Sequence, residues 1–152
     1  MGRKLTTAEA LARVPQQEPF RFVDELLELS EERAVGRYRW RPEADFYRGH
    51  FPGNPVTPGV LLIESMAQCG VVPIALQRLY AEFDDAEAAT YQTFFTDAQV
   101  DFSGVVRPGD VVTTESRVLF YRRRKIKVEA TMSGADGRIV CSGQLSGMGV
   151  AR

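Results

Sequence analysis

The alternation of apolar and polar residues is clearest in the last third of the chain. Within 125–132 every second residue is apolar, so Ile126, Val128, Ala130 and Met132 alternate with Lys125, Lys127, Glu129 and Thr131. A period of two predicts a β-strand with one buried and one solvent-facing side. The segments 90–102, 110–120 and 138–148 are also rich in strand-forming residues, and glycine-containing turns at 107–110 and 134–137 separate them.

A long apolar run in the middle of the chain follows a different pattern. The segment 59–80, GVLLIESMAQCGVVPIALQRLY, is apolar on most sides, which predicts a buried helix rather than an amphipathic surface helix. Glu64, Gln68, Pro73 and Gln77 interrupt the run at depths where hydrocarbon disfavours them, so we expect no membrane span. Pro73 is expected to kink or interrupt the helix.

The first third of the chain supplies the remaining elements. Thr6 and Glu9 form a capping-box pattern, which predicts a short first helix that Pro15 closes. The segments 20–29 and 33–40 favour strands or extended segments, and the glycine- and proline-rich segment 45–58 predicts a shaped loop. Together these elements predict one α+β domain over 1–152, with an antiparallel sheet wrapped around a central helix.

Composition and charge exclude several classes of function. A net charge of −1 and a pI near 5.9 give no global attraction to nucleic acid. The first residues have no apolar core of the length that a secretory signal needs, so a cytoplasmic location is expected. One histidine and two distant cysteines, Cys69 and Cys141, favour neither a disulfide framework nor a metal site, and we expect no cofactor.

Three polar features coincide around the start of the predicted central helix. His50 lies in the glycine- and proline-rich loop, and Glu64 and Gln68 lie one turn apart within the apolar run. Each has an ordinary interpretation: a surface or hydrogen-bonded histidine, and a carboxylate used at an interface. Pro58 and Gly59 fit a helix start, where free N–H groups could stabilise a developing negative oxygen, or they could merely turn the chain.

The segment 49–68, GHFPGNPVTPGVLLIESMAQ, resembles the signature of the 3-hydroxyacyl-[acyl-carrier-protein] dehydratases. In that family an HFPGxPxxPG loop leads into a central helix with an acid followed by MAQ. Weaker similarity covers most of the chain, including 19–29 and 105–112. The matching residues of the signature are His50, Phe51, Pro52, Gly53, Pro55, Pro58, Gly59, Glu64, Met66, Ala67 and Gln68.

The resemblance implies a hotdog fold, a division of labour and a partner. His50 of one subunit would act as base and Glu64 of the other as acid in a homodimer with shared active sites, possibly assembled as a trimer of dimers. The Gly59 N–H would stabilise the enolate-like oxygen, while Gln68, Pro58 and Phe51 would contribute to substrate binding. The substrate would be a (3R)-3-hydroxyacyl thioester on the phosphopantetheine arm of acyl carrier protein, and the product a trans-2-enoyl thioester.

Two departures from the family pattern concern the carrier protein and the acyl-binding tunnel that the resemblance implies. Asp101 stands where common relatives carry a basic residue, and Pro73 is unusual in the central helix. A basic cluster could receive the acidic carrier protein, or it could be a solvated edge strand or loop whose positive charge discourages aggregation. The cluster consists of Arg122, Arg123, Arg124 and Lys125.

Several functions remain open on sequence grounds. The dehydratase could serve fatty-acid synthesis or a dedicated pathway to polyenes or specialised lipids, and Glu64 rather than aspartate resembles the branch that only dehydrates. The alternatives are a hotdog acyl-thioesterase or a non-catalytic module that binds acyl thioesters. Retention of both His50 and Glu64 counts against the binding module, which needs neither proton-transfer group.

Overall fold

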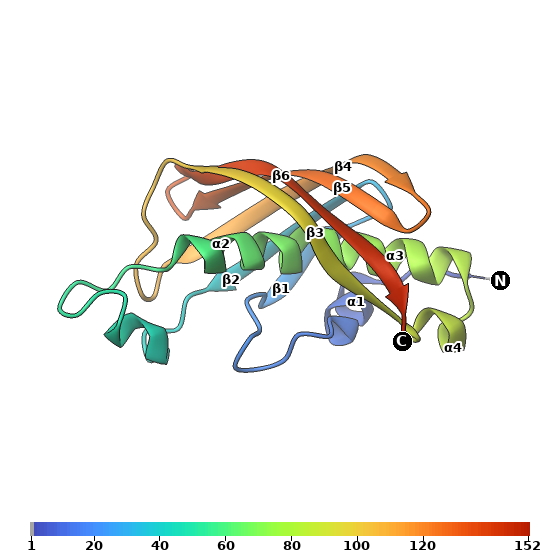
Figure 1. The fold of residues 1–152 in the computed structure, drawn as a ribbon, viewed down its shortest axis with the longest axis horizontal. Coiled ribbons are helices and arrows are strands. Elements are labelled where there is room, and N and C mark those ends of the chain that lie inside the picture. Colours follow the sequence, from blue (N-terminus) through green and yellow to red (C-terminus); the bar gives the residue numbers. More distant parts are fainter. Residues whose placement is uncertain (1) are drawn as a thin grey trace.

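The computed structural model describes residues 2–152, which form an antiparallel sheet around one long helix (Figure 1). Within these residues the sheet has six strands in the order β1-β2-β4-β5-β6-β3. The strands are β1 (Glu25–Leu29), β2 (Arg33–Arg39), β3 (Tyr91–Phe102), β4 (Val111–Arg122), β5 (Lys125–Gly134) and β6 (Ile139–Ala151). The alternation predicted for 125–132 is confirmed, because Ile126, Val128, Ala130 and Met132 are buried.

The central helix runs through three consecutive pieces. They are α2 (Gly59–Met66), a π-helical turn over Ala67–Val71, and α3 (Val72–Glu82). Pro73 has no N–H to donate back to the preceding turn, and the wider π turn lies directly before it. The helix therefore continues past Pro73 instead of ending there.

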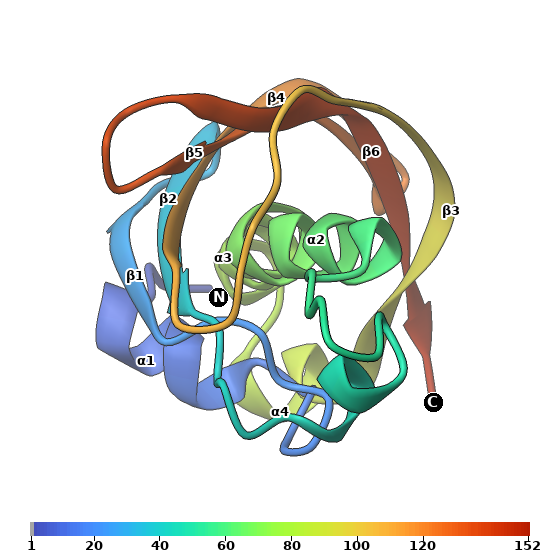
Figure 2. The same ribbon diagram turned by 90° about the vertical axis from the view of Figure 1, so that its left-hand side faces the viewer.

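The sheet curves around this helix on several sides, as the view along the helix shows (Figure 2). Gly59–Glu82 is long and apolar enough to pass for a membrane span, but 67% of its most apolar window is buried inside the protein. A Cβ on Gly70 would lie 2.1 Å from Ser116 Oγ on β4, so only glycine permits this approach of helix to sheet. The apolar helix is thus the core helix of the fold.

Short helical elements lie outside the sheet and beside the central helix, and α1 (Thr7–Arg13) packs against β1 and α3. The predicted capping box is present, because Thr6 Oγ1 accepts from the Glu9 N–H and the Thr6 N–H donates to Glu9 Oε2 at the start of α1. A 3-10 turn, Asp45–Arg48, lies in the predicted loop, and α4 (Asp85–Ala88) follows α3. The acidic segment 81–89 therefore contains the end of α3 and the whole of α4.

The segment 20–29, predicted as a strand or an extended segment, forms β1 only from Glu25 onward. The Phe22 N–H donates to the side chain of Gln68 at 2.7 Å, so this stretch of backbone bonds to the central helix rather than to a neighbouring strand. The other strands agree with the predicted segments to within a few residues at their ends.

Candidate active site

His50 lies on the loop between the 3-10 turn and α2, and a backbone carbonyl fixes its ring. Its Nδ1 is 2.7 Å from the carbonyl oxygen of Val56. A carbonyl can only accept a hydrogen bond, so Nδ1 carries the hydrogen and Nε2 of the neutral ring keeps its lone pair. Backbone hydrogen bonds from His50 to Phe46 and from Val56 to His50 hold the loop in place. His50 is thereby prepared to accept a proton at Nε2.

Glu64 lies partly buried on α2, where its carboxyl group is suited to donating a proton. Burial raises the pKa of its carboxyl group above the ordinary value, and the hydrogen bond from Gln68 opposes part of that rise. The Gln68 Nε2 donates to Glu64 Oε2 at 2.9 Å. Because Oε2 is used as an acceptor, the proton of the acid form is left to Oε1.

Gln68 is completely buried and makes three hydrogen bonds. Its Oε1 accepts from the Phe22 N–H at 2.7 Å, and its Nε2 donates to the Phe20 carbonyl at 3.1 Å as well as to Glu64. These bonds use both donor hydrogens and the oxygen of Gln68, and they orient its amide toward Glu64. The sequence did not indicate the bonds to the 20–22 backbone, because that segment is distant in sequence. The substrate-binding role expected of Gln68 stays a prediction.

Beside Glu64 lies a cavity of about 180 Å³ between the central helix and the edge strand β3. It is lined by Glu64, Ala67, Val71, Val72, Thr93 and Phe95, together with Gln16 and Phe94. His50 is not among the lining residues. A single chain therefore does not bring the predicted base and the predicted acid together in this cavity.

Pro58 and Gly59 form the start of α2, and Phe51 lies on the loop that precedes this helix. Pro58 is the N-cap of α2, and as the first helical residue Gly59 has an N–H without an acceptor inside the helix. A Cβ on Gly59 would lie 3.0 Å from the ring of Phe102, so the aromatic ring packs directly on this turn. The Phe51 ring stacks on His50 with centroids 4.0 Å apart and is half exposed. The substrate-binding roles expected of Pro58, Gly59 and Phe51 stay predictions.

The basic cluster does not lie near His50 within one chain. Arg122, Arg123, Arg124 and Lys125 form the β4–β5 hairpin, where Arg123 and Arg124 have positive φ angles of 51° and 62°. Arg124 lies over the ring of Tyr91. Figure 1 shows this hairpin at the α3 end of the central helix, whereas the His50 loop extends beyond the α2 end.

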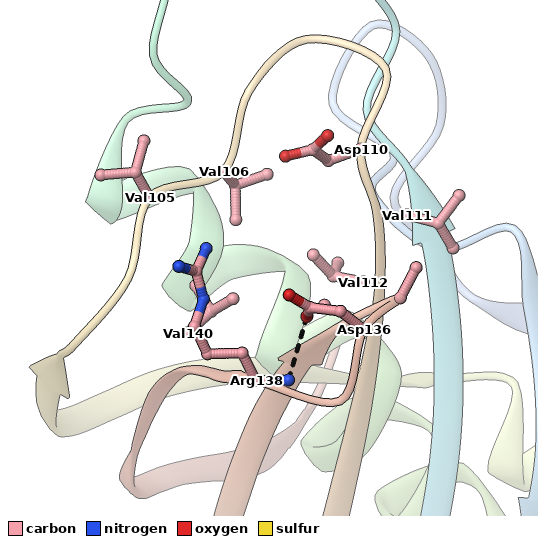
Figure 3. A pocket seen from close by; sticks show the side chains of 10 residues that line it. Val105, Val106, Asp110, Val111, Val112, Asp136, Arg138 and Val140 are labelled. Carbon is pink, nitrogen blue, oxygen red and sulfur yellow. Dashed lines mark hydrogen bonds between the residues drawn. The ribbon is translucent and has the colours of Figure 1, made fainter.

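Another cavity, of about 230 Å³, lies between the loop that precedes β4 and the β5–β6 turn (Figure 3). Five valines form half of its lining residues, and Asp110, Asp136 and Arg138 stand at its polar side. The Arg138 N–H donates to Asp136 Oδ1 at 3.0 Å. Neither His50 nor Glu64 lines this cavity, so we do not assign the chemistry to it.

The two cysteines are buried and unreactive. Burial raises the thiol pKa of Cys69 to about 12 and that of Cys141 to about 11, so little thiolate is present at neutral pH. Within residues 2–152 no group of three or more His, Cys, Asp or Glu side chains is placed to hold a metal ion.

A helix wrapped by an antiparallel sheet, with a loop histidine and a helical carboxyl group, defines the class of hotdog-fold acyl-thioester proteins. The sequence model of the FabA-like domain matches residues 14–144. The 3-hydroxyacyl-[acyl-carrier-protein] dehydratase FabZ of Caldicellulosiruptor saccharolyticus is 37% identical over 134 residues, or 87% of this chain and 89% of that protein. The FabZ of Roseiflexus castenholzii is 35% identical over 143 residues, or 93% and 94% of the two chains.

Solved structures agree on the fold. The dehydratase heterocomplex ApeI:P from Xenorhabdus doucetiae matches with a TM-score of 0.76 at 15% identity, covering 98% of this chain and 94% of that one. Thioesterase HI1161 from Haemophilus influenzae matches with a TM-score of 0.67 at 10% identity, covering 99% and 94%. The chain belongs to the FabA-like family of 3-hydroxyacyl-[acyl-carrier-protein] dehydratases, and its predicted hotdog fold is confirmed.

Proposed function

We propose that this protein removes water from 3-hydroxyacyl thioesters carried by acyl carrier protein, in fatty-acid or specialised-lipid synthesis in the cytoplasm. The proposal depends on one observation: His50 is suited to accepting a proton, and Glu64 is suited to donating one. The Val56 carbonyl leaves His50 Nε2 free to accept a proton, while burial favours a protonated Glu64 and Gln68 holds its carboxyl group in place. Such a pair fits proton abstraction next to a carbonyl followed by loss of hydroxide as water.

The reaction balances with these two groups alone. His50 Nε2 takes the proton from C2, and the Gly59 N–H at the start of α2 stabilises the negative charge on the thioester oxygen. The electrons of the C2–H bond form the C2–C3 double bond as the C3–O bond breaks. Glu64 gives its proton to the departing oxygen, so water and a trans-2-enoyl thioester form. Transfer of the proton from His50 back to Glu64 restores the starting state.

A homodimer supplies the missing half of the site in this proposal. Strand β3 is an edge of the sheet, and its aromatic side chains Phe94 and Phe95 are 54% and 43% exposed. An exposed, apolar edge strand of this length is suited to pairing with another chain. Pairing of two β3 edges would cover the cavity beside Glu64 and would place His50 of the partner subunit against it.

The test follows two products at once from a short-chain 3-hydroxyacyl thioester. Wild type is expected to produce absorbance from the conjugated enoyl group, whereas His50→Ala and Glu64→Gln are expected to lose that activity while keeping the fold. Free thiol without enoyl product would indicate a thioesterase instead. If neither product forms, even with a substrate linked to acyl carrier protein, the chain is a binding module and the dehydratase proposal is wrong.

A further inference from the structure

The cavity beside Glu64 is followed by a second one along the same side of the central helix. The second cavity has a volume of about 200 Å³ and lies beneath the first part of β3. Leu76 and Leu79 form part of its wall, and Val72 and Thr93 line both cavities. These two residues therefore stand between the two spaces.

The positions along the helix agree with one continuous path. The lining residues Glu64, Ala67, Val71 and then Val72, Leu76 and Leu79 recur mostly three or four residues apart, as one helix face requires. The adjacent pair Val71 and Val72 falls where the π turn ends, which shifts the phase of the face. From Glu64 to Val72 the helix rises roughly 12 Å, and to Leu79 roughly 22 Å.

We propose that Val72 and Thr93 set the acyl-length limit of the enzyme by separating the cavity at Glu64 from the second cavity. This inference rests on the proposed dehydratase function. A short acyl chain ends in the first cavity. A longer chain has to pass between the side chains of Val72 and Thr93, because both residues line both cavities and Val72 is only 4% exposed.

The chemistry of the second cavity favours a neutral alkyl end. Arg13 and Arg152 also line it. Arg13 lies 3.9 Å from the carboxylate of Asp85 and over the Tyr80 ring, and Arg152 donates to the Ala89 carbonyl. Leu76 and Leu79 suit methylene groups.

The experiment measures kcat/KM for a series of straight-chain 3-hydroxyacyl thioesters of increasing length, with enoyl absorbance as the readout. In wild type, kcat/KM is expected to fall at one chain length and to stay low beyond it. In Val72→Ala the ratio of long-chain to short-chain kcat/KM is expected to rise about tenfold, the discrimination that a misfit of a methylene group produces. Thr93→Ser, which removes one methyl group from the opposite wall, is expected to shift the ratio in the same direction.

Two further variants separate this inference from a general loss of packing. Val128→Ala is the matched control, because Val128 is fully buried in the sheet and lines neither cavity. Its long-to-short ratio is expected to equal that of wild type. Adding Ala89→Leu to Val72→Ala refills the second cavity and is expected to remove the gain for long chains.

The outcomes also separate the inference from the function on which it rests. Wild-type turnover that is independent of chain length, or an unchanged ratio in Val72→Ala and Thr93→Ser, would overturn the length limit and leave the dehydratase intact. An equal rise in Val128→Ala would overturn it as well. Absence of enoyl product from wild type at every length would overturn both.

Discussion

Replacement of Gln68 by leucine tests whether this side chain prepares Glu64 for proton donation. The substitution removes three hydrogen bonds and leaves the Phe22 N–H and the Phe20 carbonyl without their side-chain partner. A buried polar group that loses its partner costs about 1–3 kcal/mol, and only the Phe22 N–H is fully buried, so the free energy of unfolding should fall by about that amount. Catalysis should change in a separate and more specific way.

The specific effect is on the pH dependence of kcat/KM. Burial raises the pKa of Glu64 and the Gln68 N–H lowers it, so loss of Gln68 leaves burial unopposed and moves the pKa further upward. The alkaline limb, where the acid loses its proton, should therefore move to higher pH while the maximal rate falls because Glu64 is no longer held. The assay is enoyl formation across the pH range, together with urea unfolding.

Ser65→Ala is the matched control for this prediction. Ser65 is a fully buried polar residue of the same helix, and its Oγ donates to the Phe22 carbonyl at 2.8 Å. Loss of this hydrogen bond in Ser65→Ala should lower the free energy of unfolding without moving the alkaline limb of the kcat/KM profile. Gln68→Glu offers a second route, because another carboxyl group beside Glu64 should also raise its pKa. An alkaline limb that stays in place, or moves to lower pH, in both Gln68 variants would refute the reasoning.

Four further predictions follow from contacts described above. Mixing His50→Ala with Glu64→Gln under conditions of subunit exchange should restore about a quarter of wild-type activity, since half the dimers are mixed and each has one intact site; no recovery would contradict a shared site. Gly70→Ala should lower the unfolding free energy by more than about 2 kcal/mol because its Cβ meets Ser116 Oγ, and Ser116→Gly should rescue part of the loss in urea unfolding. Arg123→Gly should raise stability by about 1 kcal/mol, because φ is positive there, as thermal and urea unfolding can measure. Burial raises the folded pKa of Glu64 above its unfolded value, so wild-type stability should decline as pH rises through this interval, and unfolding of Glu64→Gln at several pH values should lack that decline.

Much of the fold follows from the sequence because its signals are local. The alternation over 125–132, the capping box of Thr6 and Glu9, and the length of the apolar run each depend on residues close together in the chain. The resemblance of 49–68 to the dehydratase signature identified the family and pointed to His50 and Glu64. The strand positions needed only period-two patterning and turn residues.

The features that sequence reasoning missed depend on contacts between distant segments. The start of β1 at Glu25 and the orientation of the Gln68 amide have one cause, the hydrogen bonds between Gln68 and the 20–22 backbone. The π turn depends on how the helix accommodates Pro73 while packing on the sheet. Separation of the basic hairpin from the His50 loop follows from the length of β4, which carries the cluster to the other end of the central helix.

The tie between Gln68 and the 20–22 segment also has a consequence for the order of folding. Glu64 and Gln68 are neighbours on one helix, but the amide is oriented only by backbone 46 residues earlier in the chain. A folding intermediate with the helix formed and this segment undocked would contain both residues of the pair without a directed proton donor. Recovery of activity during refolding should therefore follow the docking of the N-terminal segment rather than the formation of the central helix.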